Sequence, residues 1–426
     1  MGHSCADANG GATIVELRPW RPTRLCGIDK AHKKAREKTA MRPLIVGWGH
    51  TKFGRHDALS VEDLIHMAAR EALDDAGIDA NQIDAVWLGH FNSGLVPDGF
   101  CSSMVLGIDP ALRFKPATRV ENACASGSAA LYAAVDAIQS GRVRVALVVG
   151  AEKMSGLDTA GVTRALGGAS YQREEAGLSF PDIFARFAKA YGERYGDPTE
   201  AMAHIAVKNH ENALGNPLAQ MHRALTLDFC RTVSEKNPMI SDPLKVSDCS
   251  LISDGAAAIV LVADDMAGAF KKAVGFRALS HVSDLLPLSA KDLPAFEGPA
   301  RAIAQAYAAG GVSVEDLSLA EVHDCFTIAE LLTVEALGLV APGEGRAAVI
   351  DGATRRGGAL PINLSGGLKA KGHPVGATGV SMHVIAARQL LGQAGDMQLP
   401  GAHLAMCVNM GGGAVATYAS ILEAVK

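Results

Sequence analysis

The stretch NACASGSAALYAAVDAIQSGRVRVALVVGAEKMS, residues 122–155, decides the fold. Small and apolar residues over 126–141 favour a helix, and Gly141 is the residue type that commonly ends one. The apolar, valine-rich run over 143–152 is typical of a strand buried on both faces. A helix that leads through a glycine turn into such a strand predicts an α/β protein with a largely parallel sheet.

The same order of elements recurs on both sides of this stretch. A predicted helix over 61–77 ends on glycine, and an acidic turn and a strand follow it. Residues 298–317 predict a helix and a glycine turn, and a strand over 319–324 follows in the same register. A later helix over 376–393 matches the one in the quoted stretch. We therefore predict an internal duplication, with halves at 41–270 and 271–426 and equivalent helix starts facing each other across a pseudo-twofold axis.

Two segments depart from this repeat. Residues 153–249 contain amphipathic helices joined by polar loops, and we expect an inserted loop domain there. Such an insertion often carries substrate contacts, although helices that only pack would give the same pattern. Residues 1–40 have no apolar stretch long enough for a signal peptide, and their acidic residues argue against a mitochondrial presequence. We expect them to be a mobile extension, with regular structure beginning after Met41.

The composition argues against several classes of function. The 426 residues carry 40 Lys and Arg against 45 Asp and Glu, so no overall positive charge favours nucleic acid. The eight cysteines are widely spaced without a Cys-x-x-Cys pair, which indicates neither a disulfide framework nor a zinc site. No apolar run approaches the roughly 20 residues of a membrane helix. We therefore expect a soluble, cytoplasmic protein that binds neither metal, nucleic acid nor membrane.

Cys124 is the first candidate for chemistry. It lies at the expected start of a helix and is followed by four small residues, which let a ligand approach the backbone closely. A helix N-terminus has partial positive charge and free amide donors, so it favours a thiolate and can hold an oxyanion. The alternative is a buried structural thiol, because free cysteine is among the most buried residue types.

Two glycine-rich loops also carry candidates. Residues 365–384 bring His373 to the front of a helix, where a neutral imidazole can deprotonate a thiol; a solvated loop histidine is the alternative. In the block CVNMGGG, residues 407–413, Cys407 stands near a strand end before a glycine turn. The amides of that turn would point into a site, or the turn would be a plain hairpin between core strands.

The block EVHDCF, residues 321–326, gathers ionisable side chains at the end of an apolar strand. Ligands in parallel α/β sheets bind at the carboxyl ends of strands, which makes His323, Asp324 and Cys325 candidates for a site. Asp324 would alternatively cap the helix that follows.

Taken together, these blocks resemble the thiolases in order and spacing, and the resemblance covers nearly everything after Met41. Its blocks are residues 122–155, 249–261, 321–326, 366–379 and 407–413. The resemblance implies a thiolase fold, with two βαβαβ halves in a five-layered αβαβα arrangement and an inserted loop domain. It also implies a homodimer or homotetramer.

The resemblance assigns roles to the candidate residues. Cys124 would carry the acyl group as a thioester, and His373 would activate that thiol. A second cysteine would move protons at the α-carbon of acetyl-CoA. His323 and Cys325 stand in a His-Asp-Cys-Phe block, as in the sterol-carrier-protein-type thiolases, where commoner thiolases have Asn-Glu-Ala-Phe. The second cysteine is therefore Cys325, which we favour because its motif is intact, or Cys407, as in the common type.

The resemblance also implies contacts with the substrate. Ser250 would touch the pantetheine arm of coenzyme A, and Gly376, Asn409 and Gly411 would line the site. Asn409 departs from the common thiolases, which have glycine there. No permanently bound cofactor is expected, because coenzyme A is a substrate.

The sequence therefore predicts a CoA-dependent acyltransferase of fatty-acid and lipid metabolism. It would cleave 3-oxoacyl-CoA with CoA or run the reverse Claisen condensation of acetyl-CoA. One alternative is a ketoacyl-synthase-like condensing enzyme, which would lack a second acid/base thiol. The others are a thiolase-like retro-aldolase and a non-catalytic partner subunit, both of which would be expected to alter Cys124 or His373.

Overall fold

The computed structural model describes residues 41–426, so the expectation for residues 1–40 lies outside the described part. The strands are β1 (Pro43–His50), β2 (Ala85–Gly89), β3 (Ala117–Val120), β4 (Val145–Glu152), β5 (Met239–Ser241), β6 (Leu244–Lys245), β7 (Gly255–Ala263), β8 (Val274–Ser283), β9 (Leu319–Val322), β10 (Leu404–Gly411) and β11 (Ala416–Ala424). The α-helices are α2 (Val61–Ala76), α3 (Cys101–Met104), α4 (Ser126–Gln139), α5 (Thr159–Gly167), α6 (Gln172–Glu175), α7 (Phe180–Tyr195), α8 (Thr199–Ala213), α9 (Leu227–Arg231), α10 (Glu297–Gly310), α11 (Thr327–Ala336), α12 (Gly345–Ile350) and α13 (Val375–Leu390). One π-helical turn, η9 (Gly367–Lys371), precedes α13.

The strand order repeats in the two parts of the main sheet. That order is β3-β2-β4-β7-β1-β8-β11-β10-β9, and only two residue pairs join β1 to β8. Outside β9, a parallel bridge between Ala320 and Ile362 occupies the place that β3 has beside β2. Each part therefore has the same sequence of neighbours, as expected of a duplication.

The sheet is less parallel than the sequence pattern predicted. Parallel pairing holds for β3–β2, β2–β4 and β10–β9, whereas β4–β7, β7–β1, β1–β8, β8–β11 and β11–β10 are antiparallel. The reason is visible in β10 and β11, which a short turn joins directly; a parallel pair needs a crossover. Apolar runs alone do not reveal this direction.

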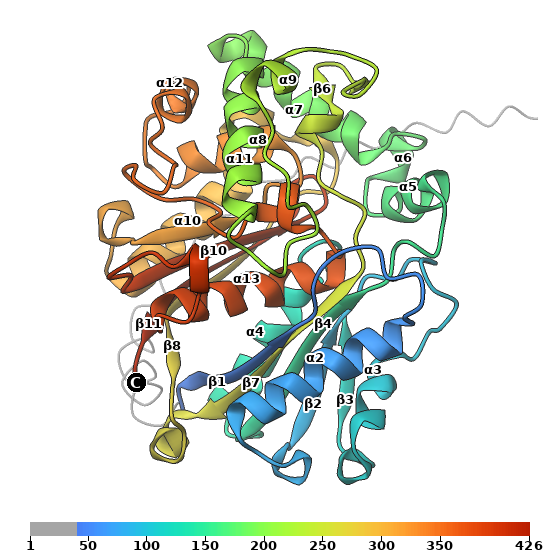
Figure 1. Cartoon of the computed structure of the whole chain (residues 1–426), viewed down its shortest axis with the longest axis vertical. Helices are drawn as coiled ribbons and strands as arrows, with labels where there is room; N and C mark the ends of the chain where they lie inside the picture. The colour runs from blue at the N-terminus through green and yellow to red at the C-terminus, as the bar shows by residue number, and fades with distance from the viewer. Residues whose placement is uncertain (1–40) are drawn as a thin grey trace, which may run out of the picture. The chain divides into compact units, whose positions relative to one another are not determined.

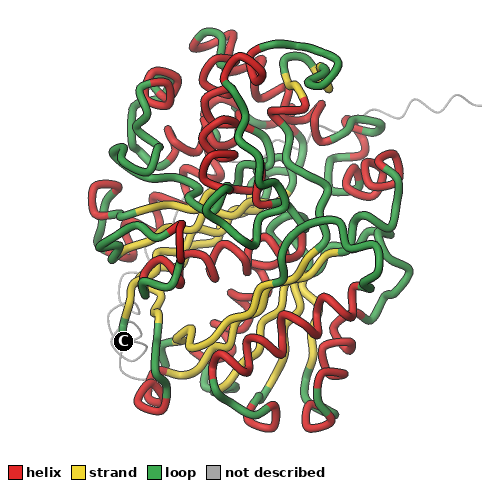
Figure 2. Tube along the Cα trace, viewed as in Figure 1, coloured by secondary structure: helices red, strands yellow, loops and turns green. Residues whose placement is uncertain are grey.

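Three buried apolar clusters separate five layers, which agrees with the predicted thiolase architecture. One cluster packs α2 and α3 against β1, β2, β4 and β7. A second surrounds α4 and α13, which lie between the two parts of the sheet (Figure 1). The third packs α10 and α11 against β8 to β11, so helices and strands alternate in layers (Figure 2).

Alternation along β4 shows how the sequence produces these layers. Ala146 and Val148 face the central helices, whereas Leu147 and Val149 face the outer layer with α2. Every residue of β4 is buried, which explains its continuous apolar run.

Glycine allows the two central helices to touch at their starts. A Cβ added at Gly127 of α4 would lie 2.7 Å from the Gly376 carbonyl oxygen of α13. Such a distance leaves no room for a side chain. The starts of α4 and α13 therefore lie together, next to Cys124 and His373.

The segment predicted as a loop domain contains α5 to α9. The predicted helices over 180–196 and 200–214 are α7 and α8, and α7 begins with a capping box made by Ser179 and Asp182. Apolar residues of α7 and α8 share the core cluster of α10 and α11, which places these helices over the second part of the sheet (Figure 1). Across residues 41–426, none of the helices has the length and apolar character of a membrane span.

Candidate active site

Cys124 lies in a tight elbow two residues before α4. Ala123 has a φ of 51°, in the left-handed region that alanine rarely adopts. The Ser126 hydroxyl accepts from the Asn122 amide at 2.9 Å and donates to the Ala123 carbonyl at 2.6 Å, which closes the elbow. Strain of this kind is typical of functional sites, where surrounding contacts hold it in place.

The electrostatics of Cys124 differ from the sequence expectation. The helix N-terminus predicted a stabilised thiolate, but the pKa of the thiol is raised to about 12. Burial is the main cause and the negative charge of Glu152 is the second, and together they outweigh an amide contact from Gly412. The resting nucleophile is therefore a neutral thiol, and attack requires a base.

His373 has the environment of that base. Its amide donates to Ser253 Oγ at 2.9 Å, and its Nδ1 lies 2.7 Å from Thr378 Oγ1. The Thr378 hydroxyl donates its hydrogen to the Pro374 carbonyl, so its oxygen can only accept a hydrogen bond from His373 Nδ1–H. His373 therefore carries its proton on Nδ1, and Nε2 keeps a free lone pair. Nε2 is buried and has no hydrogen-bond partner. Burial and the charge of Lys371 lower the pKa of His373 to about 3, so the imidazole is neutral.

His323 is held in the opposite tautomer. The Asn409 amide nitrogen lies 2.9 Å from His323 Nδ1 and 3.3 Å from the Cys124 carbonyl, which only a donor satisfies. The Asn409 oxygen accepts from the Ser128 hydroxyl at 2.8 Å, which fixes the amide orientation. Nδ1 of His323 is thus an acceptor and Nε2 carries the proton. Burial, followed by the neighbouring His373, lowers the pKa of His323 well below its usual value.

These three residues form one cluster, which joins three of the predicted sequence blocks. The Cys124 sulfur and one ring nitrogen each of His323 and His373 all lie within 4.8 Å of one another. The two rings meet edge to face, with centroids 5.1 Å apart. One cysteine and two histidines could also ligate zinc, but a ligating histidine normally donates its other N–H to an acceptor, and His323 Nδ1 faces a donor instead. The cluster therefore fits proton transfer better than metal binding.

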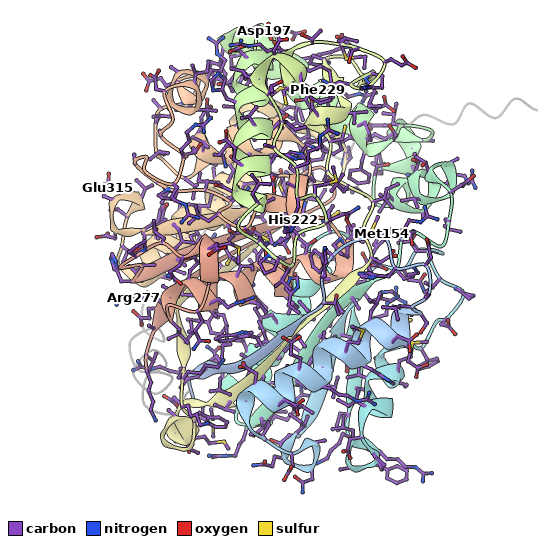
Figure 3. The ribbon with its side chains drawn as sticks, in the orientation of Figure 1. Met154, Asp197, His222, Phe229, Arg277 and Glu315 are labelled. Carbon is purple, nitrogen blue, oxygen red and sulfur yellow. The ribbon has the colours of Figure 1, made fainter. Side chains whose placement is uncertain are left out.

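A cavity of about 180 Å³ opens beside this cluster, between the sheet end and the predicted loop domain. Its wall is mostly apolar and includes Met154, which Figure 3 labels. The lining residues are Cys124, Met154, Thr159, Val162, Thr163, Leu166, Phe180, Pro181, Cys249, Ser250, Leu251, Ile252, Cys325, Phe326, His373, Val375 and Gly412. Ser250 and Cys325 lie on adjacent segments, because the Ser250 amide donates to the Cys325 carbonyl at 2.9 Å.

Five predicted site residues do not line this cavity. His323 and Asn409 are bonded to each other in the cluster beside it, and the other three lie elsewhere. Cys407 lies in the core between β10 and α13, with its sulfur 3.5 Å from the Met382 carbonyl. Gly376 packs against β4 and donates its amide to Glu152 at 3.0 Å. Gly411 permits close packing, since a Cβ there would lie 2.2 Å from the Asn122 carbonyl oxygen.

Several residues around the site were not singled out from the sequence. Gly412 lines the cavity in place of Gly411, and Ser253 and Thr378 hold His373. Ser253 and Thr378 lie inside blocks that the resemblance used, so their position in those blocks was an available signal. Glu152, at the end of the strand over 143–152, also lies inside one of these blocks, and it is a charged residue directly after an apolar run.

Comparisons with known proteins give one consistent result. Residues 44–228 match the family described as "Thiolase, N-terminal domain", and residues 281–424 match "Thiolase C-terminal domain-like". The acetyl-CoA acetyltransferase of Methanothermobacter thermautotrophicus is 39% identical and aligns with 86% of this chain and 96% of its own length. Sterol carrier protein 2 of Homo sapiens is 34% identical and aligns with 88% of this chain and 71% of its own length.

Two solved structures share the fold. The Ltp2-ChsH2(DUF35) aldolase superposes with a TM-score of 0.75 and 24% identity, covering 91% of this chain and 98% of its own. The acetyl-CoA acetyltransferase from Syntrophomonas wolfei gives a TM-score of 0.70 and 20% identity, covering 90% of this chain and 99% of its own. At these identities the likeness concerns the architecture alone.

Proposed function

The chain belongs to the thiolase family, and from this premise we propose that it catalyses CoA-dependent acyl transfer through a Cys124 thioester. In the cleavage direction it converts 3-oxoacyl-CoA and CoA into acetyl-CoA and a shortened acyl-CoA. In the reverse direction it condenses acetyl-CoA with an acyl-CoA. The relatives that are named acetyl-CoA acetyltransferases support this activity.

The observation that carries the proposal is the complementary pair of histidine tautomers around one neutral thiol. His373 Nε2 has a free lone pair and takes the proton of Cys124 as the sulfur attacks the 3-oxo carbon. His323 Nε2 carries a proton and stabilises the charge that develops on the substrate oxygen. The bond between C2 and C3 then breaks, which leaves the acyl group on sulfur and an acetyl-CoA enolate.

Cys325 is the proton donor that we propose for this enolate. Its thiol lines the cavity with Cys124, whereas Cys407 points into the core. Burial, the nearby Cys124 and Asp324 raise the pKa of Cys325 well above its usual value, so it carries a proton at neutral pH. CoA thiol completes cleavage by attacking the Cys124 thioester; its proton goes to the Cys325 thiolate, and the leaving Cys124 sulfur regains its proton from His373. In condensation these steps run in reverse, so Cys325 first gives its proton to the departing CoA thiolate, and the resulting Cys325 thiolate removes a proton from the acetyl-CoA α-carbon.

Coenzyme A enters as a substrate, and we propose no permanently bound cofactor. Ser250 lines the cavity and would contact the pantetheine arm, with apolar walls around it. We propose that acyl-CoA esters of fatty-acid and lipid metabolism are the substrates.

The alternatives fit the site less well. A ketoacyl-synthase-like enzyme has no use for a second thiol, yet Cys325 lines the same cavity as Cys124. A retro-aldolase or a non-catalytic subunit would be expected to have altered Cys124 or His373, and both residues are present. The aldolase likeness concerns the architecture alone.

We propose a homodimer or homotetramer, supported by the edge strand β3, whose outer side has no strand partner among residues 41–426. We propose a cytoplasmic location, supported by six free cysteines among those residues. The repeated strand order supports halves at 41–270 and 271–426 with a loop domain over 153–249.

Thiolysis of acetoacetyl-CoA by free CoA tests the function. Wild-type protein is expected to form two acetyl-CoA per acetoacetyl-CoA consumed, and Cys124→Ser is expected to lose about 10⁴-fold in kcat, because an alcohol is a far weaker nucleophile. A wild-type protein without this activity, or a Cys124→Ser variant as active as wild type, would contradict the proposal.

A further inference from the structure

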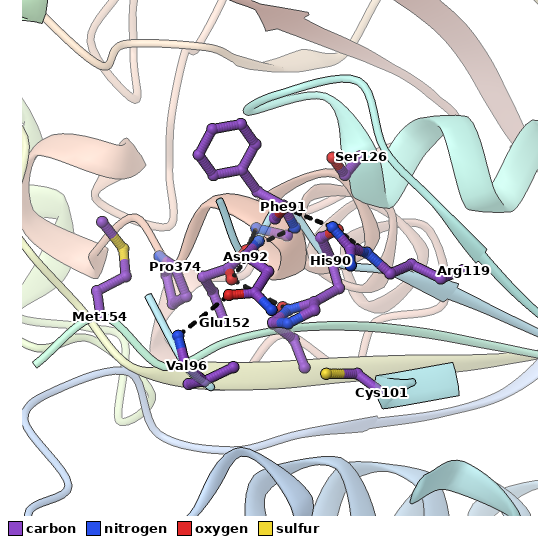
Figure 4. Close-up of polar contacts among 12 residues, drawn as sticks. His90, Phe91, Asn92, Val96, Cys101, Arg119, Ser126, Glu152, Met154 and Pro374 are labelled. Atoms are coloured by element: carbon purple, nitrogen blue, oxygen red, sulfur yellow. Dashed lines mark hydrogen bonds and ion pairs between the residues drawn. The ribbon is translucent and has the colours of Figure 1, made fainter. Parts of the chain in front are cut away.

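Glu152, the last residue of β4, is a buried carboxylate that contacts both halves of the molecule. Its side chain is completely buried. It accepts hydrogen bonds from the Phe91 and Asn92 amides at 2.9 and 3.0 Å, both in the loop after β2. It also accepts from the Gly376 amide of α13 at 3.0 Å. One carboxylate thus joins β4 and the loop after β2 to the first turn of α13, and Figure 4 shows Glu152 beside Phe91, Asn92 and His90.

A second histidine balances this carboxylate. His90 Nδ1 lies 3.0 Å from the Glu152 carboxylate and 2.9 Å from the Ala151 carbonyl, and the side chains of this pair are fully buried. Burial is the largest single influence and disfavours the His90 cation, but the Glu152 charge and the hydrogen bonds to His90 together outweigh burial and raise the pKa of His90 to about 10. Glu152 is therefore a paired and fully hydrogen-bonded anion, which is the condition for keeping a charge inside a protein.

The contact with Gly376 lies three residues after His373. A Cβ added at Gly376 would lie 2.4 Å from the Ala151 carbonyl oxygen and 2.9 Å from the Glu152 carboxylate. The first turn of α13 therefore rests directly on the end of β4. That turn also contains Thr378, which holds the His373 ring, so whatever fixes the turn fixes the base.

The negative charge of Glu152 also reaches Cys124. It is the second cause, after burial, of the raised pKa of that thiol, and the charge of Glu121 makes a smaller contribution in the same direction. The titratable groups of the cluster and the cavity lining carry no charge near neutral pH; they are Cys249, His323, His373 and Cys325. His90, which contacts Glu152, is a cation that offsets part of the field of this carboxylate. Glu152 still makes the largest charge contribution to the raised pKa of Cys124.

We propose that Glu152 is a positioning residue for the acyl transfer, because it holds the first turn of α13, which begins two residues after His373, against the end of β4. This inference rests on the proposed function, because the geometry it maintains is that of nucleophile and base. A misplacement of about 1 Å between reacting groups can cost roughly 10²-fold in rate. The carboxylate thus has two separable effects, one through geometry and one through charge.

Two substitutions separate these effects. Glu152→Gln keeps the shape but removes the charge and one acceptor oxygen, whereas Glu152→Asp keeps the charge and shortens the reach to Gly376. We expect both to lower kcat for thiolysis by about 10- to 100-fold with KM changed less than about threefold. Iodoacetamide labelling of the Cys124 peptide, followed by mass spectrometry against pH, reads the charge effect. Its midpoint is expected to fall by about one pH unit or more in Glu152→Gln and to stay unchanged in Glu152→Asp.

Glu335→Gln is the matched control. Glu335 is a buried carboxylate that accepts from the Tyr191 hydroxyl and the Gly345 amide, away from the cavity lining. If Glu152 had only a structural role, Glu152→Gln would change kcat per folded molecule no more than the control does. The pH midpoint of Cys124 labelling would also stay at its wild-type value. These results would overturn the proposal. If Glu152→Gln does not fold, an unchanged kcat in Glu152→Asp overturns it equally. The labelling comparison needs no turnover, so a wild-type protein without thiolase activity would refute the function separately.

Discussion

The central layer and the apolar wall of the cavity face the same space but are built differently. Beside the central layer, His373 donates to Thr378 and His323 accepts from Asn409 of β10, and these two hydrogen bonds fix the tautomers of both histidines. On the opposite wall, side chains such as Val162, Leu166 and Phe180 contribute shape without polar partners. The catalytic step therefore depends on directional hydrogen bonds, so a substitution there should lower the rate sharply. The size of the substrate depends on cavity volume, so a substitution in the wall should change substrate preference by a smaller factor.

Removal of the base is expected to have the largest effect on the reaction while leaving the cavity wall unchanged. His373→Asn is expected to lower kcat for thiolysis by about 10³-fold, because general base catalysis contributes on that scale and the Cys124 pKa of about 12 leaves almost no thiolate at neutral pH. Steady-state kinetics with acetoacetyl-CoA measure this change. A loss of less than about tenfold would mean that another group activates the thiol.

The two candidate cysteines give the next largest effect. Cys325→Ala is expected to lower kcat by about 10²-fold while the Cys124 thioester still forms from acetyl-CoA, because proton transfer at the α-carbon is lost and nucleophilic attack is not. Cys407→Ala is the matched control, expected within about twofold of wild type after correction for folded protein. Reversal of this order would assign the acid/base role to Cys407.

The cavity wall should respond more weakly. Phe180→Ala enlarges the cavity at a half-buried position. We expect less than about fivefold change in kcat/KM for acetoacetyl-CoA and a rise of about tenfold in the preference for longer 3-oxoacyl-CoA substrates. A thiolysis panel of increasing chain length measures both. Should Phe180→Ala damage acetoacetyl-CoA cleavage as severely as His373→Asn, the division between reaction and shape would fail.

The smallest expected effect is the response of acylation to pH. The reactive form combines neutral His373, whose pKa is about 3, with protonated Cys124, whose pKa is about 12. His373 gains a proton only as pH falls toward 3, and Cys124 loses one only as pH rises toward 12. Rapid-quench acylation rates should therefore vary by less than about twofold between about pH 6 and pH 9. A midpoint near pH 7 would contradict these assignments.

Much of the fold and part of the site could be predicted from the sequence. The helix after Cys124 and the strand that follows it carry unambiguous local patterns, and the duplication placed the start of α13 beside the start of α4. Cys124 and His373 could therefore be expected to meet, as they do within 4.8 Å. The parallel character of the sheet was overestimated because strand direction depends on how connections return, which apolar runs do not encode.

The sequence did not show which side chains of a buried strand reach the site and which remain in the core. Cys407 and Asn409 share one face of β10, but Asn409 reaches the cluster and Cys407 stays in the core. The thiol chemistry of Cys124 was expected to be set by the helix N-terminus, whereas burial and Glu152 dominate. Both outcomes depend on distances between segments far apart in sequence, and no local pattern reports those distances.

The most direct measurement of the central claim is the mass of the Cys124 peptide after the protein meets acetoacetyl-CoA without free CoA. We predict that one acetyl group is found on Cys124 and that it is transferred to CoA when CoA is added. Acetylation of Cys124 should be much slower in His373→Asn. An unmodified Cys124 peptide, or an acetyl group carried by Cys325 or Cys407 instead, would contradict it.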